Sequence, residues 1–258
     1  MKRLVVYTLL CLGLVLSSCG KHGGSSLHFD ADSARVLIEQ AMADSLIPGA
    51  VLCVVDEGEI VHLEAYGYRA IVPEHEAMTT NTIFDLASVS KPTGAGTAAL
   101  LLIKEGKLSA DDLVCKYIPN YHPDVTIRHL LTMTAPYKYK SEPWTKVCTS
   151  DDWTKAALDL LGGRSGITGE FKYSTLGIQI MAGIIENASG MKLIDFANEY
   201  LFDPLGIPQH VNHGASSKED QFDFLMNKNP RKHEWYSDPK NTVTAGWGLT
   251  LSATDMAR

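Results

Sequence analysis

The sequence predicts an α/β fold in which a β-hairpin is followed by a largely helical half. Two runs rich in β-branched residues, at 49–56 and 59–68, are separated by a short turn, as paired strands are. Three apolar segments, at residues 93–103, 176–188 and 193–202, have the length and composition of helices. A chain of 258 residues with this pattern can bury one large core or two small ones.

Each predicted element has local signals at its ends. Residues 33–45 carry apolar side chains at helical spacing, with Asp32 or Ser33 as the cap and Pro48 beyond the last turn. Residues 93–103 are almost all apolar or small, which predicts a buried helix that ends before a glycine. The remaining signals are Asp56-Glu57-Gly58 as the hairpin turn, Gly106 after 93–103, Thr126 before a helix at 127–133, Gly190 after 176–188, Pro204 after 193–202, and strand character at 244–251.

Composition and charge exclude several classes of function. The formal net charge is -7, whereas a protein that binds nucleic acid needs a basic face. His210 and His213 are one helical turn apart, but Pro208 and Gly214 flank them and a zinc site needs a fuller ligand set. We therefore expect no nucleic-acid partner, no metal and no cofactor.

The N-terminus has the pattern of a secretory signal. Lys2 and Arg3 precede a nearly unbroken apolar run, residues 4–16, which is too short to be a comfortable transmembrane span. The next residues, Ser17 and Ser18, are small, as at a cleavage site.

Residues 16–19 resemble a bacterial lipobox, which implies cleavage before Cys19 and acylation of its sulfur. The alternative is a plain signal peptide that contains a cysteine. We expect residues 1–19 to be a lipoprotein signal and residues 20–32 to be a flexible tether. The protein would then be anchored by lipid in the bacterial cell envelope, on the periplasmic or outer surface. Of the cysteines beyond the signal, Cys115 and Cys148 could pair or stay free.

Ser88 and Lys91 have the spacing of a nucleophile and its base. Side chains three residues apart on a helix share one face, so Lys91 can reach the Ser88 hydroxyl. A serine needs a nearby base to become a good nucleophile, and burial and a helix N-terminus both disfavour the ammonium form of a lysine. The Ser88 amide is a candidate donor to an oxyanion. Pro92 must then lie in the first helical turn, where its missing N–H matters least.

The alternative is that Ser88 caps a helix and Lys91 is solvated. The same spacing also occurs at Ser18 to Lys21, across the predicted cleavage site, and at Ser237 to Lys240, in a polar segment that contains a proline. Of these, the motif at Ser88 alone lies between an apolar strand-like segment and a buried helix, which favours the catalytic interpretation.

Residues 84–92, Phe-Asp-Leu-Ala-Ser-Val-Ser-Lys-Pro, resemble the first active-site motif of class C β-lactamases, DD-peptidases and related esterases. That family also has a Tyr-x-Asn motif, and residues 171–177 stand in the matching place. The resemblance implies that Tyr173 is a shared general acid and base, acidified by Lys91. Thr175 replaces the asparagine of the family and offers one hydroxyl instead of an amide, which favours an esterase or peptidase over a dedicated lactamase.

Residues 126–134, 201–207 and 244–256 resemble three further family segments in the same order. The implied fold is β-lactamase/transpeptidase-like, an antiparallel sheet plus a helical subdomain, formed by residues 33–258. The third family motif, Lys-Thr-Gly or His-x-Gly, does not occur after Tyr173. We therefore expect the C-terminal strands to be missing from this sequence, and little or no turnover by the chain as written.

The function implied is a serine hydrolase that forms an acyl-enzyme at Ser88 with an ester, a D-peptide or a β-lactam-like substrate. Thr175 and Trp247 are candidate substrate contacts, although Trp247, like Trp144 and Trp153, could instead pack in the core or on the surface. The expected partners are a small-molecule or peptidoglycan-derived substrate and, through the anchor, the membrane. The alternatives are a non-catalytic fold that binds peptidoglycan or a protein, and a fragment without function.

Overall fold

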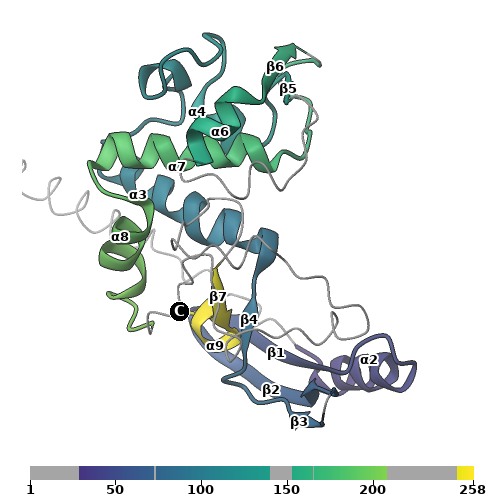
Figure 1. The fold of residues 1–258 in the computed structure, drawn as a ribbon. Helices are drawn as coiled ribbons and strands as arrows, with labels where there is room; N and C mark the ends of the chain where they lie inside the picture. Colours follow the sequence, from purple (N-terminus) through teal and green to yellow (C-terminus); the bar gives the residue numbers. More distant parts are fainter. Residues whose placement is uncertain (1–28, 73, 140–152, 165, 208–248) are drawn as a thin grey trace, which may run out of the picture.

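The computed structural model describes residues 29–72, 74–139, 153–164, 166–207 and 249–258 (Figure 1). Within them, a small sheet with one helix lies at one end and a helical half lies at the other, with a two-stranded sheet between (Figure 1). The sequence predicts the first part of this arrangement, a β-hairpin followed by a largely helical half.

The first helix, α2 (Ala31–Ala43), begins earlier than predicted. Its cap is Asp30, whose carboxylate accepts from the Ser33 backbone N–H at 3.1 Å, so the prediction of Asp32 or Ser33 as cap is wrong. Asp30 takes the position because it has extended backbone angles and its side chain reaches an amide three residues on. The helix therefore includes residues 31 and 32, which the sequence placed in the tether.

The predicted hairpin is confirmed. Strands β1 (Gly49–Asp56) and β2 (Glu59–Ala70) pair antiparallel, and β3 (Glu76–Ala77), which the sequence did not predict, adds a third strand beside β2. Glu57 and Gly58 both have positive φ, at 48° and 84°, as a two-residue turn of this handedness requires. The register is thereby set at the turn.

A second sheet joins distant parts of the chain. Strand β4 (Ile83–Asp85) pairs antiparallel with β7 (Thr250–Ser252), and Phe84 lies opposite Leu251. Helix α9 (Ala253–Met256) follows β7 and contacts β1, so the last residues described lie against the first sheet (Figure 1).

Three helical geometries follow β4 where the sequence predicted one helix. A 3-10 turn, η1 (Ala87–Val89), precedes a π-helical segment, η2 (Lys91–Gly96), and α3 (Thr97–Lys104). Pro92 lies in the first turn, as expected, and the Thr97 hydroxyl donates to its carbonyl at 3.1 Å. The Thr97 backbone N–H also donates to this carbonyl, five residues back, which is the hydrogen bond of a π turn, and such turns are frequent at functional sites.

The helical half is built around α7 (Thr175–Ser189), which is capped by Ser174 and ends at Gly190 with φ 75°. The predicted end signals at Thr126 and Gly190 agree with the structure, whereas the Ser174 cap was not predicted. The other elements are η3 (Val114–Lys116), α4 (Ile127–Leu131), β5 (Tyr137–Tyr139), α6 (Trp153–Asp159), β6 (Leu161–Arg164), α8 (Leu193–Ala197) and η4 (Asn198–Phe202). The β5–β6 hairpin and α6 were not predicted.

The main core lies between α3 and α7. Ala98 and Leu102 of α3 and Ile180 and Ile184 of α7 are fully buried, and α4 and α8 pack on the same cluster. Each large side chain buried in this way contributes about 1.5–3 kcal/mol. Because η2 also contacts α7, this core sets the distance between the start of α3 and the start of α7.

Several predictions lie outside the described residues: the signal and lipidation site at Cys19, most of the tether, Cys148, the pair His210 and His213, and Trp247. Cys53 and Cys115 are free thiols. No helix in the described ranges has both the length and the apolar character needed to cross a membrane.

Candidate active site

A strained turn delivers Ser88 to its position. Ala87 has φ 42°, a conformation that residues other than glycine adopt rarely and at about 1–3 kcal/mol. The Asp85 carboxylate accepts from the Ala87 N–H at 2.8 Å and so holds the turn between β4 and η1. Strain of this kind is frequent where a side chain must be aimed at a reacting group.

Two hydrogen bonds fasten the turn to the segment that precedes β7. The Leu86 N–H donates to the Leu249 carbonyl at 2.9 Å, and the Leu249 N–H donates to the Ser90 hydroxyl at 3.1 Å. Ser90 is buried, so this second bond is shielded from water. Ser90, one of the two residues between Ser88 and Lys91, is therefore a structural anchor.

Ser88 and Lys91 meet as the spacing predicts. The Lys91 Nζ donates to the Ser88 Oγ at 2.9 Å. Lys91 is only 4% exposed, whereas Ser88 is open to solvent. The alternative of a solvated lysine does not fit this burial. An accessible hydroxyl with a buried amine behind it has the arrangement that an activated nucleophile requires.

Tyr173 approaches the same oxygen from the loop before α7. Its hydroxyl donates to the Ser88 Oγ at 2.7 Å, and the Lys91 Nζ lies 5.1 Å from the centre of its ring. With both neighbours protonated, Ser88 accepts from both and cannot pass on its own proton. When either neighbour is deprotonated, it becomes the acceptor for that proton.

The surroundings identify the phenol as a group that can lose its proton. Burial by itself raises the pKa of Tyr173, but hydrogen bonds with Lys91 and Ser88 and the charge of Lys91 outweigh it. The net effect is a pKa below the ordinary 10.0. A weaker hydrogen bond from Thr175 acts in the same direction.

Thr175 was predicted as a substrate contact, and the structure places it beside the phenol. It is the first residue of α7, and its side chain shares a hydrogen bond with Tyr173. Ser174, between them, accepts from the Gly177 N–H at 2.9 Å and starts the helix. Thr175 therefore helps to lower the pKa of the Tyr173 hydroxyl. The second predicted contact, Trp247, lies outside the described residues.

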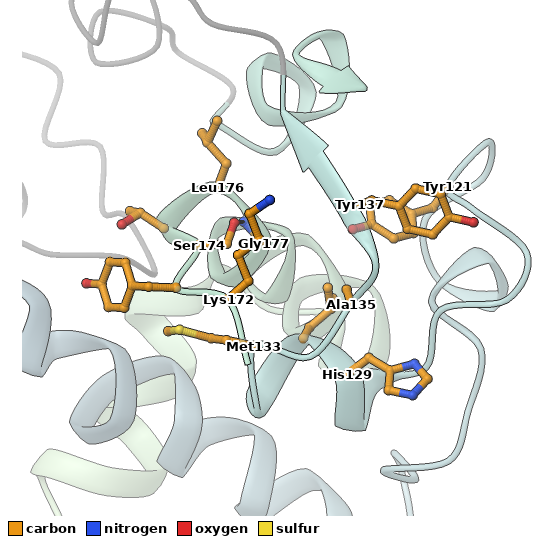
Figure 2. A pocket seen from close by; sticks show the side chains of 12 residues that line it. Tyr121, His129, Met133, Ala135, Tyr137, Lys172, Ser174, Leu176 and Gly177 are labelled. Carbon is orange, nitrogen blue, oxygen red and sulfur yellow. Dashed lines mark hydrogen bonds between the residues drawn. The ribbon is translucent and has the colours of Figure 1, made fainter. Parts of the chain in front are cut away.

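A cavity of about 290 Å³ adjoins Tyr173 and Thr175 on the side of α4 and β5 (Figure 2). Sequence reasoning missed it, because its walls come from three separate stretches of the chain. The one signal in the sequence was the position of Lys172 next to Tyr173, which could have suggested Lys172 as a lining residue. The lining residues are Tyr121, His129, Leu130, Met133, Ala135, Tyr137, Lys172, Tyr173, Ser174, Thr175, Leu176 and Gly177.

No group of three or more histidine, cysteine, aspartate or glutamate side chains is placed to hold a metal within the described part of the chain. The side chains that meet at Ser88 can transfer protons, and the Ser88 hydroxyl can act as a nucleophile.

Known proteins are similar to this chain in sequence and in fold. The family model of beta-lactamases matches residues 34–258. Penicillin-binding protein 4* of Bacillus subtilis is 33% identical over 191 residues, covering 65% of this chain and 41% of that protein.

Two solved structures show the same fold. EstCE1, described as "a hydrolase with promiscuous acyltransferase activity", has a TM-score of 0.67 and 21% identity, covering 86% of this chain and 68% of its own. The octameric penicillin-binding protein homologue from Pyrococcus abyssi has a TM-score of 0.61 and 22% identity, covering 89% and 55%. The predicted fold class, antiparallel sheet plus helical subdomain, is confirmed.

The chain spans about two-fifths of the length of the curated relatives it matches. The family model nonetheless covers all of the chain beyond its first 33 residues, including Ser88, Lys91 and Tyr173. The resemblance found in the sequence is thereby confirmed, and the chain belongs to the beta-lactamase family.

Proposed function

We propose that this chain is a serine hydrolase that forms an acyl-enzyme at Ser88. The observation that carries the proposal is the convergence of two proton-handling groups on one exposed hydroxyl, Lys91 at 2.9 Å and Tyr173 at 2.7 Å. Family membership supports the class of reaction, because β-lactamases, esterases and penicillin-binding proteins in this family share a hydrolytic chemistry.

In the acylation step, Tyr173 as phenolate takes the proton of Ser88 while the Ser88 Oγ attacks the carbonyl carbon. The bond from that carbon to the leaving oxygen or nitrogen then breaks, and Tyr173 returns the proton to the leaving group. In deacylation, Tyr173 takes a proton from water, the hydroxide attacks the acyl carbon, and Ser88 recovers a proton as the acid departs. The net reaction adds one water across the ester or amide bond.

Lys91 acts mainly through its charge in this scheme. A buried cation beside the phenol stabilises the phenolate, and the low polarity of its surroundings strengthens the effect. The Ser88 amide belongs to the first residues of a helical segment, whose N–H groups lack helical acceptors. It is the donor proposed for the oxyanion.

The proposed substrates are esters and D-peptides ahead of β-lactams, because Thr175 stands where an amide side chain is typical of the family. The proposed location is the cell envelope, with a lipid anchor at Cys19. The name of the Bacillus relative, a penicillin-binding protein, agrees with an envelope substrate.

The test is labelling by a fluorophosphonate, which reports attack by the nucleophile even if turnover is slow. We expect labelling of the folded chain and its complete loss in Ser88→Ala. Ser33→Ala is the matched control, because Ser33 lies on α2, distant in sequence from Ser88 and outside the site. It should be labelled to the same extent as the unmodified chain. Hydrolysis of 4-nitrophenyl acetate measured alongside reports turnover.

Absence of labelling in a chain whose circular dichroism shows it folded would reject the hydrolase and favour the binding alternative. Labelling that persists in Ser88→Ala would reject the assignment of the nucleophile. Turnover at enzyme-like rates would overturn the expectation of little activity from this chain.

A further inference from the structure

We propose that the cavity beside Tyr173 binds the acyl part of the substrate and selects acyl groups that carry a carboxylate remote from the scissile carbonyl. The inference rests on the proposed function, since it assigns the substrate class of the same site. The cavity volume of about 290 Å³ is near the lower end for ligand pockets, about 300–1,000 Å³, and suits a short chain with one polar end.

The cavity adjoins the reaction site through two residues that belong to both. Tyr173 and Thr175 line it and also form the general acid and its neighbour beside Ser88. Lys172 is fixed at the backbone, because its N–H donates to the Met133 carbonyl at 2.7 Å. An acyl group whose carbonyl carbon lies at Ser88 can therefore extend past Tyr173 into the cavity.

The walls combine an apolar surface with hydrogen-bond donors. Leu130, Met133, Ala135 and Leu176 contribute apolar surface, and Figure 2 shows Ala135 between Lys172 and the tyrosine pair. An aliphatic chain of a few carbons would fill this part of the cavity.

The polar groups of the lining favour an anion. Lys172 supplies an ammonium group. The His129 Nδ1 accepts from the Thr126 N–H at 3.2 Å, so in the neutral ring the proton lies on Nε2, which is a donor. None of the twelve described lining residues is acidic, and Lys172 has no ion-pair partner among the residues that the structure describes. The lining therefore offers positive charge and donors without a compensating carboxylate.

The carboxylate of Asp124, which is bonded to the lining residue Tyr137, is already paired. The Tyr137 hydroxyl donates to Asp124, and Arg164 pairs with the other oxygen of that carboxylate at 2.9 Å. The hydrogen bond from Tyr137, with a further contribution from Arg164, holds the pKa of Asp124 below 3.8 although burial opposes it. Asp124 thus stays a paired anion and does not occupy Lys172.

A stacking contact also holds Tyr137 in place in the wall of the cavity. The His122 ring stacks on the Tyr137 ring with 3.4 Å between centres and 5° between planes, and the His122 Nε2 lies 3.0 Å from the Gly162 carbonyl. A wall held from both sides loses little freedom when a ligand binds, which favours selectivity.

The test compares two esters of equal chain length, 4-nitrophenyl hexanoate and mono-4-nitrophenyl adipate, which differ by the terminal carboxylate. We expect kcat/KM for nitrophenol release to be about tenfold higher for the adipate, the effect of one charge-assisted hydrogen bond. Lys172→Gln should bring the ratio near one. Lys104→Gln, an exposed charge at the end of α3, is the matched control and should leave the ratio unchanged.

A ratio near one in the unmodified chain, with release that depends on Ser88, would overturn the selectivity and leave the hydrolase intact. If neither ester reacts at Ser88, the proposed function fails, and calorimetry on Ser88→Ala then decides the cavity. Binding of monomethyl adipate about tenfold tighter than methyl hexanoate, lost on adding Lys172→Gln, would support the cavity. Equal binding would reject it.

Discussion

Replacing Tyr173 by phenylalanine tests the centre of the proposed chemistry. The change keeps the ring and removes only the hydroxyl that donates to Ser88 at 2.7 Å, so the packing of the loop before α7 is preserved. A general acid and base contributes about 10²–10⁴-fold to rate, which corresponds to about 3–5 kcal/mol of the barrier. We expect fluorophosphonate labelling of Ser88 to slow by at least about a hundredfold.

The pH dependence of labelling provides an independent check. Because the pKa of Tyr173 is below 10.0, its phenolate fraction rises with pH and reaches one half below pH 10. The labelling rate of the unmodified chain should therefore rise with pH with a midpoint below pH 10. Tyr173→Phe should lose this inflection.

Tyr68→Phe is the control, because Tyr68 is a partly exposed residue of β2 outside the site. It should label at the rate of the unmodified chain. A Tyr173→Phe rate within about threefold of the unmodified chain, less than 1 kcal/mol, would refute the role given to the phenol.

Three further predictions concern stability. Leu102→Ala should lower the free energy of unfolding by about 2–5 kcal/mol in denaturant titration, whereas Leu100→Ala, on the exposed face of α3, should change it by less than about 0.5 kcal/mol. Gly190→Ala should lower it by about 1 kcal/mol, because φ is 75° there. The hydrogen bond from Tyr117 holds the pKa of Asp112 below 3.8 in the folded chain. As pH falls, the Asp112 carboxylate is therefore protonated in the unfolded chain before it is protonated in the folded chain. The melting-temperature difference between the unmodified chain and Asp112→Asn should therefore persist above about pH 4 and vanish as pH falls through the folded value.

Local elements were predictable where neighbouring residues determine them. The hairpin turn at residues 56–58 and the caps at Thr126 and Gly190 agree with the structure, because turn angles and capping bonds involve residues a few positions apart. The first helix shows the limit of such signals. Several residues near its start could cap it, and the backbone angles of Asp30 decided between them.

The sequence by itself determined the pairing of Ser88 with Lys91, since three residues of helical backbone bring the two side chains together. Tyr173 was identified only through the resemblance to a family, because it lies 85 residues from Ser88 and no rule of spacing connects them. The tertiary structure decided the 2.7 Å contact, the burial of Lys91, and the cavity that Lys172 and His129 share. These features depend on how α7 packs against α3 and α4, and such packing follows from the summed burial of many side chains rather than from any local pattern.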